Sequence, residues 1–274
     1  MESASLPYSL FLILAELGLG TAIVMQAVDL RGVVTRGFVK ATTIMVPMVL
    51  ALATWVALTL NGVAVEGYRL DTGARDVTVA LMVVATGLSL LHNGAILTDR
   101  VTAGRMIGGA LTLVAVATLL AAAVMLRIPV WGMGLIFFSL LFGSLAVGLA
   151  VVGLSLGHWY LVTPRLPAQP LNEITLLFLL VVMVQILLFG LAVALPVDQA
   201  PQGGRDIELA DDVTFWLRIL VGLAMPLVFG WMAWASSRAR SMMSATGLLY
   251  LVTALVLAGE IAARALLLDS ARPI

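Results

Sequence analysis

The chain contains no cysteine among its 274 residues. The absence of thiols excludes disulfide bonds, thiolate metal ligands, cysteine-ligated iron–sulfur clusters and a cysteine nucleophile. Charged residues are also scarce, because Asp, Glu, Lys and Arg make up 11% of the chain, against about 25% in a typical soluble domain. The formal net charge is zero, so no basic surface favours nucleic acid. We expect no nucleic acid among the partners.

Several motifs of membrane enzymes are also missing. The chain has no phosphate-binding glycine loop, no Gly-x-Ser-x-Gly, no His-Glu-x-x-His and no aspartate-rich pair of the kind that binds magnesium pyrophosphate. Most membrane hydrolases and prenyl- or phosphotransferases need one of these clusters. We therefore predict a non-catalytic subunit rather than a stand-alone enzyme.

Apolar residues dominate what is present. The chain is 62% hydrophobic with a mean hydropathy of +1.11. A membrane span needs about 20 mostly apolar residues, and the segments that qualify are 7–28, 41–60, 77–97, 107–126, 133–162, 173–195, 214–235 and 243–266. They are continuously apolar, whereas strands of a membrane barrel alternate. We predict an all-α integral membrane protein, a single polytopic domain over 1–274, with eight transmembrane helices in four up-down hairpins forming a bundle.

The loops predict an orientation. We call side B the side of the loops that follow the first, third, fifth and seventh segments, and side A the opposite side. Side B has eight Lys and Arg residues in its loops and side A has four, so the positive-inside rule places side B in the cytoplasm. The short head carries Glu2 and no basic residue, which is unlike a signal peptide. We expect a bacterial-type inner membrane with both termini outside.

The only two histidines lie in a repeated pattern. Residues 87–92 and 153–158 both read Gly-Leu-Ser-Leu-x-His, and an arginine follows each copy, Arg100 and Arg165. Both segments run from side A to side B, and the histidines lie at similar depth, on the order of 10 Å inside those arginines. Parallel helices that are diagonal partners in a four-helix bundle could clamp a planar cofactor between two such imidazoles.

This geometry predicts one bis-histidine haem b, with His92 and His158 as the ligands of the haem iron. Small residues beside them, Gly94 and Gly157, leave room for a macrocycle. Arg100 and Arg165 suit haem propionates, although ordinary positive-inside flanking is the simpler account of both. The alternatives for the histidines are helix–helix hydrogen bonding and a proton, metal or substrate role, and two histidines alone leave a transition metal short of ligands.

Other polar residues interrupt the apolar segments. Glu16 lies near the middle of the first segment, where a carboxylate is a candidate proton carrier or quinone ligand, or a partner in an interhelical hydrogen bond. Glu260 and Arg264 have the spacing of a helix-surface ion pair. Arg218 is expected to snorkel to side A. Interhelical hydrogen bonds are expected for three further residues, Gln26, Asn93 and Gln185.

Three functions follow from these patterns. The first is a membrane-anchor or electron-transfer subunit of a larger respiratory or photosynthetic-type redox complex, which binds haem b and exchanges electrons with quinone. The second is a haem-free structural scaffold subunit of a multiprotein complex. The third is a small-molecule or lipid permease that uses Glu16.

The expected partners are the lipid bilayer and other membrane subunits. A basic soluble protein could also dock at the acidic loop 196–213, for which a solvated loop is the simpler account. The architecture resembles the eight-helix, two-bundle membrane subunits of respiratory and haem-handling systems, a resemblance of fold alone.

Overall fold

The structure is a computed structural model that describes residues 6–60, 70–127, 132–163, 166–194, 209–270 and 273. These residues form helices and no strand. The helices are α1 (Leu6–Arg31), α2 (Arg36–Thr43), α3 (Met45–Thr59), α4 (Thr72–Leu97), α5 (Val101–Met125), α6 (Gly132–Val162), α7 (Gln169–Ala194), the 3₁₀ turn η1 (Leu209–Asp211), α8 (Val213–Leu217), the π-helix η2 (Arg218–Ala224), α9 (Met225–Arg238) and α10 (Met242–Ser270).

The eight predicted apolar segments are confirmed as helices that are long and apolar enough to cross a membrane. Two of these segments are composite, because α2 with α3 forms the second, and α8, η2 and α9 together form the seventh. Several helices begin earlier than predicted; α5, for example, begins at Val101 rather than at 107. The first turns of these helices contain polar residues, which hydropathy does not detect. The length of the apolar segment therefore underestimates the length of the helix.

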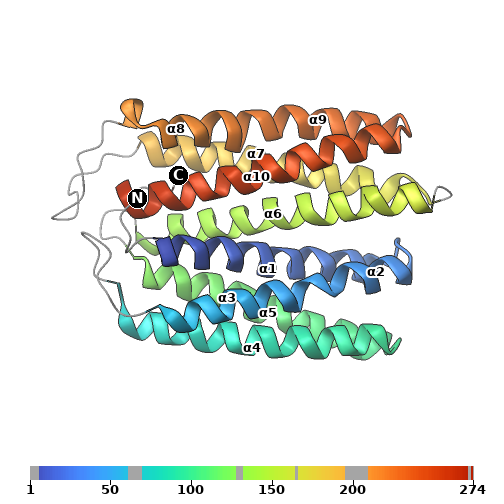
Figure 1. Cartoon of the computed structure of the whole chain (residues 1–274), viewed down its shortest axis with the longest axis horizontal. Helices are drawn as coiled ribbons and strands as arrows, with labels where there is room; N and C mark the ends of the chain where they lie inside the picture. Colours follow the sequence, from blue (N-terminus) through green and yellow to red (C-terminus); the bar gives the residue numbers. More distant parts are fainter. Residues whose placement is uncertain are drawn as a thin grey trace.

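The helices lie along one common axis in two groups (Figure 1). In this view α1, α3, α4 and α5 form the lower group and α6, α7, α9 and α10 the upper group. The main contact between the groups is α1 against α6. One apolar core lies mostly within the lower group and includes Phe11, Leu50 and Leu111, and a second includes Val152, Phe178 and Val252 of the upper group.

Small residues bring the backbones of α1 and α6 into contact. A Cβ atom at Gly20 would lie 1.9 Å from the Ser144 carbonyl oxygen, and one at Gly148 would lie 2.4 Å from the Gly20 carbonyl oxygen. Only residues without a side chain fit at such a crossing, as is common between membrane helices. The two groups therefore meet along a close seam.

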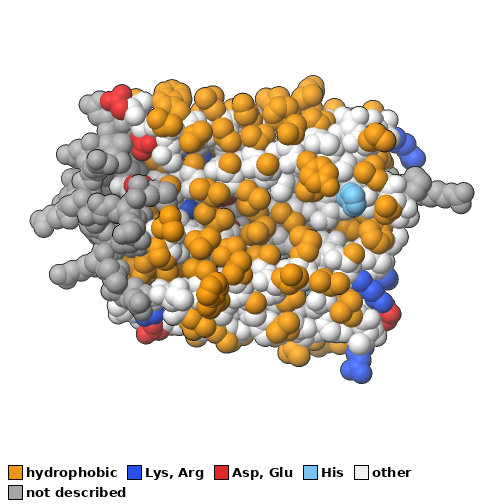
Figure 2. All heavy atoms as spheres, viewed as in Figure 1, with side chains coloured by type: hydrophobic (Ala, Val, Ile, Leu, Met, Phe, Trp, Pro, Cys, Tyr) orange, Lys and Arg blue, Asp and Glu red, His pale blue; other side chains and the backbone are white. Residues whose placement is uncertain are grey.

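The outer surface is apolar between the two ends of the molecule. Figure 2 shows hydrophobic side chains along the helices, with charged side chains mainly toward the ends. Large apolar side chains point outward, with exposed fractions of 69% for Met48, 73% for Leu113 and 77% for Met243. Soluble monomers rarely expose contiguous apolar surface of more than a few hundred Å². This surface suits hydrocarbon rather than water.

Two prolines lie where helices lose their regularity. Pro47 follows the break between α2, which ends at Thr43, and α3, which begins at Met45. Pro226 is the second residue after the π-helix η2, which ends at Ala224. Proline has no N–H to donate to the carbonyl one turn earlier, and such sites interrupt a helix.

Candidate functional site

Six polar side chains from five helical elements meet inside the bundle, and we call them the buried network. None of them is more than 7% exposed. The members are Glu16 of α1, Ser139 of α6, Gln185 of α7, Arg218 of η2, and Glu260 and Arg264 of α10.

Arg264 is the centre of the network and is fully buried. Its Nη2 atom lies 2.9 Å from Glu260 Oε2 and 3.0 Å from Glu16 Oε1. The same guanidinium donates to Ser139, with Nη1 3.2 Å from the hydroxyl and Nη2 3.3 Å from the carbonyl oxygen. One cation therefore joins α1, α6 and α10.

Glu260 binds the remaining members of the network. Its Oε1 atom accepts hydrogen bonds from Gln185 Nε2 at 2.7 Å and from Arg218 Nη1 at 3.1 Å. Both of its oxygens are thus paired, one with each arginine. A buried carboxylate with this many donors is well compensated for the loss of water.

Glu16 is less well satisfied. Its Oε1 atom is within ion-pair distance of Arg264, but neither of its oxygens has a hydrogen-bond partner among the described residues. Gly143 of α6 leaves the room for this contact, because a Cβ atom there would lie 2.9 Å from Glu16 Oε1 and 2.7 Å from Glu260 Oε2. Glu16 is the loosely held member of the network.

The network lies well inside the bundle toward side A. Glu16 is on the order of 15 Å along the helix from the start of α1, and Glu260 is about as far from the end of α10. Two carboxylates and two guanidiniums give the network a formal charge of zero. Paired, neutral charge is the arrangement that a hydrocarbon environment tolerates best.

Two expectations for this region are wrong. Glu260 and Arg264 do not form a helix-surface pair, since their side chains are 1% and 0% exposed. Arg218 does not snorkel to side A, because it is 3% exposed and paired with Glu260. The spacing of Glu260 and Arg264 predicted their contact correctly but not its burial. That burial follows from contacts with distant helices, which the local spacing does not encode.

The predicted interhelical hydrogen bonds of two glutamines are confirmed. Gln185 joins α7 to α10 through Glu260. Gln26 joins α1 to α5 by donating to the Arg105 carbonyl oxygen at 2.9 Å. Both amides therefore contribute to packing between helices.

The two histidines occupy different surroundings. His92 of α4 is 4% exposed, whereas His158 of α6 lies at the exposed surface. A Cβ atom at Gly108 of α5 would lie 3.0 Å from His92 Nε2 and 1.9 Å from Gln26 Oε1. Both atoms thus face the space beside Gly108, and neither has a hydrogen-bond partner within the described part of the chain.

The structure does not bring the histidines together. In the described residues α4 packs mainly on α2, α3 and α5, while α6 packs mainly on α1, α2, α5, α7 and α10. Figure 1 shows α4 and α6 in different groups, with α1 between them. The diagonal arrangement that a haem clamp needs is not formed. The residues do not fit one haem ligated by both histidines of a single chain, and haem binding stays a prediction for a spectrum to test.

The other predicted cofactor residues are also dispersed. A Cβ atom at Gly94 would meet no other atom within 4 Å, whereas one at Gly157 would lie 2.9 Å from Thr246 Oγ1 of α10. Gly157 therefore serves helix packing. Arg100 is exposed at the start of α5. Arg165 lies outside the described residues, as does most of the acidic loop 196–213.

The fold and the buried network define an all-helical protein with eight membrane-length helices around a compensated cluster of charges. Comparisons with protein-family models, with curated proteins and with solved structures find no match. The function is therefore argued from the geometry of the chain alone.

Proposed function

We propose that this chain is an integral membrane permease for a small molecule or lipid, with the buried network as the switch between its states. Its side B faces the cytoplasm, and both termini lie outside. The observation that carries this proposal is Arg264, which binds Glu16 from one helix group and Glu260 from the other.

The energetic cost of the network supports a function. A charged side chain at the centre of a bilayer costs roughly 2.5–3.5 kcal/mol on insertion scales. Replacement of buried ion pairs by apolar residues of similar volume is often neutral or stabilising. A scaffold needs only packed apolar helices, so four buried charges are more than its role requires. A permease needs groups that exchange partners.

The helix beside the network supports a moving part. Arg218 is the first residue of η2, and Pro226 follows the end of η2. π-helical segments are rare within α-helices and occur frequently at functional sites. This element can change its winding and so move Arg218 relative to Glu260.

The contact between the helix groups supports the same motion. The seam at Gly20, Ser144 and Gly148 is backbone against backbone. At Gly20 and Gly148 no side chain separates the two helices, although apolar side chains of α1 and α6 pack together elsewhere. Rocking of two halves around a site near the midplane is how many transporters expose their substrate to each side in turn.

In this proposal Glu16 acts as the exchangeable member of the network. Its only charged contact is Arg264, and its second carboxylate oxygen has no hydrogen-bond partner among the described residues. When Glu16 separates from Arg264, Arg264 stays paired with Glu260. The separation therefore leaves only the Glu16 carboxylate unpaired. The polar part of a substrate would take its place.

The redox-subunit hypothesis needs a cofactor clamp that one chain does not form here. Its test is the spectrum described in the Discussion. The scaffold hypothesis is separated from the permease by access of water to the network. In a scaffold the buried network stays inaccessible to water, whereas in a permease water reaches it in at least one state.

Cysteine accessibility tests the proposal without knowledge of the substrate. The chain has no cysteine, so Ser139→Cys places a single thiol beside Arg264. We expect a charged methanethiosulfonate reagent to modify this thiol in proteoliposomes at least about tenfold faster than the thiol of Ala115→Cys. Ala115 is also buried, 0% exposed against 7% for Ser139, and lies in the apolar core of the lower group.

A second variant makes the result specific to the network. Addition of Arg264→Gln to Ser139→Cys removes the link between the groups and should speed the modification further. Equal, negligible modification of both single-cysteine proteins would contradict the permease and favour the scaffold.

A further inference from the structure

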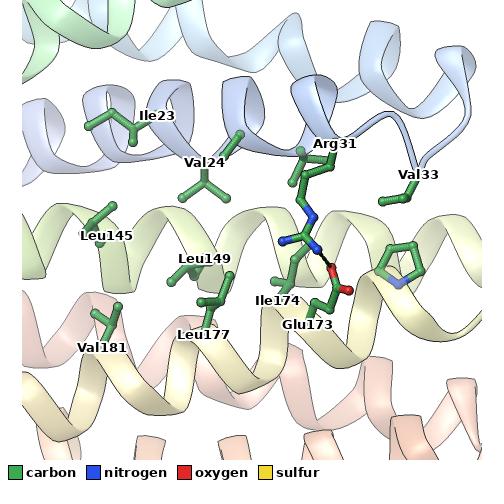
Figure 3. A pocket seen from close by; sticks show the side chains of 13 residues that line it. Ile23, Val24, Arg31, Val33, Leu145, Leu149, Glu173, Ile174, Leu177 and Val181 are labelled. Atoms are coloured by element: carbon green, nitrogen blue, oxygen red, sulfur yellow. Dashed lines mark ion pairs between the residues drawn. The ribbon is translucent and has the colours of Figure 1, made fainter.

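A groove with a volume of about 240 Å³ lies between α1, α6 and α7 (Figure 3). Its walls are almost entirely apolar, with Ile23 and Val24 from α1, Leu145 and Leu149 from α6, and Leu177 and Val181 from α7. Leu177 is 46% exposed. The groove is therefore open to the surroundings of the bundle, which for a membrane protein is lipid.

An ion pair closes the side-B end of this groove. Arg31, the last residue of α1, reaches across α6 to Glu173 of α7, with Nη2 3.0 Å from Oε2 (Figure 3). The side chains of Arg31 and Glu173 are 56% and 27% exposed. The guanidinium thus keeps a free face toward the membrane surface while it borders an apolar channel.

The dimensions match one leaflet of a bilayer. From Ile23 to Arg31 the groove follows α1 for roughly 12 Å, and one leaflet of a hydrocarbon core is about 15 Å thick. An acyl chain that enters at Arg31 would therefore end near the middle of the membrane. A head group would remain at the level of Arg31.

The charge at this end favours an anion. At the groove itself, Arg31 and Glu173 compensate one another. Asp29, two residues before Arg31 on α1, pairs with both Arg36 and Arg105. The side-B end of α1 therefore carries one surplus positive charge among the described residues. Anionic lipids of the cytoplasmic leaflet are attracted by such residues, at about 1 kcal/mol for each Lys or Arg near the surface.

We infer that the groove binds an anionic phospholipid of the side-B leaflet, with one acyl chain between α1 and α7 and the phosphate on Arg31. The inner end of the groove approaches the buried network, because Gln185 is one turn beyond Val181 on α7 and Gly143 lies close to Leu145 on α6. This inference rests on the proposed function in one respect, since it names an anionic lipid as the class of substrate that enters the permease.

Native mass spectrometry of the full chain from detergent micelles tests the inference. The probes are phosphatidylglycerol and phosphatidylcholine with identical acyl chains. We expect stronger retention of phosphatidylglycerol by the wild type. Arg31→Gln should weaken that retention about fivefold, which equals about 1 kcal/mol, and Glu173→Gln should strengthen it because it frees the guanidinium. Arg240→Gln removes a charge from the same side away from the groove and should change nothing.

Filling the groove provides a second, independent test. Ala27 lines the groove at an exposed position of α1, so Ala27→Trp should displace both lipids without disturbing the core. Ala51→Trp, at an exposed position of α3 outside the groove, is the control and should retain them. Equal retention of the two lipids with no response to Arg31 or Glu173 would overturn the inference. So would preferential retention of added ubiquinone, a neutral lipid, over phosphatidylglycerol.

The inference and the proposed function can fail separately. Selective retention of phosphatidylglycerol, with an unreactive thiol in the Ser139→Cys protein, would leave a lipid-binding protein that is not a permease. A reactive thiol in that protein without lipid selectivity would leave a permease for another substrate and would refute the assignment of the groove.

Discussion

The charge balance of the buried network leads to a quantitative prediction. Arg264→Gln leaves Glu16 without the only ion-pair partner that it has among the described residues, and gives the network a net negative charge. Glu16→Gln gives it a net positive charge but leaves Arg264 bound to Glu260. The double variant is neutral again and keeps the pair between Arg218 and Glu260. The two single variants should therefore cost more in sum than the double variant.

The magnitude follows from the burial of these groups. Removal of one partner of a buried ion pair typically costs about 3–5 kcal/mol, and the partners here are 0% and 1% exposed. We expect Arg264→Gln to lie in that range and Glu16→Gln to cost less. Groups that share one network couple by about 0.5–3 kcal/mol. The double variant should recover stability by an amount of that order.

Thermal unfolding in detergent micelles, followed by the fluorescence of the six tryptophans, measures this cycle. For a soluble chain of roughly this size 1 kcal/mol corresponds to about 2–4 °C in Tm, so Arg264→Gln should lower the midpoint by on the order of 10 °C. Additive effects of the two substitutions would refute the reasoning, because they would mean that Glu16 and Arg264 do not act as one unit. An Arg264→Gln protein as stable as the wild type would refute it too.

Three further predictions use the same preparations. Gly20→Ala should lower the midpoint by several degrees because its Cβ would meet the Ser144 backbone, whereas Gly109→Ala, with nothing within 4 Å, should not. A reduced-minus-oxidised visible spectrum should show no bis-histidine haem b in the monomer, since His92 and His158 lie on helices from different groups; a sharp reduced α-band lost in either alanine variant would contradict this. Gly108→Ala should destabilise the chain by displacing Gln26, which the same unfolding assay would register.

The eight helices could be predicted from the sequence because membrane-length apolar runs carry that information locally. Each apolar segment needs only its own residues to satisfy its backbone in lipid. The breaks between α2 and α3 and at η2 lie close to Pro47 and Pro226, which interrupt a helix for a local reason. What the sequence did not reveal is which polar residues share a space, because that depends on how the helices pack.

The histidines and the buried network both show this limit. The histidines share a sequence pattern but no site, and the network residues share a site but no sequence pattern. The repeated Gly-Leu-Ser-Leu-x-His pattern suggested a shared site, yet the two copies meet different neighbours. No motif joins Glu16 to Arg264, yet they are in contact. The usable signal was that each lies within a long apolar helix, where an ionisable residue needs a partner. Glu260, one turn before Arg264, was the only partner that spacing could identify.

The contact between Glu16 and Arg264 also constrains the order in which the chain assembles. Glu16 belongs to α1 and Arg264 to α10, 248 residues later in the chain. At about 5–20 residues per second of synthesis, Glu16 waits on the order of tens of seconds for its counter-ion. During that interval Glu16 lacks its ion-pair partner. The docking of α1 against α10 therefore comes late in assembly, and a chain truncated before α10 would leave Glu16 without the guanidinium that pairs with it.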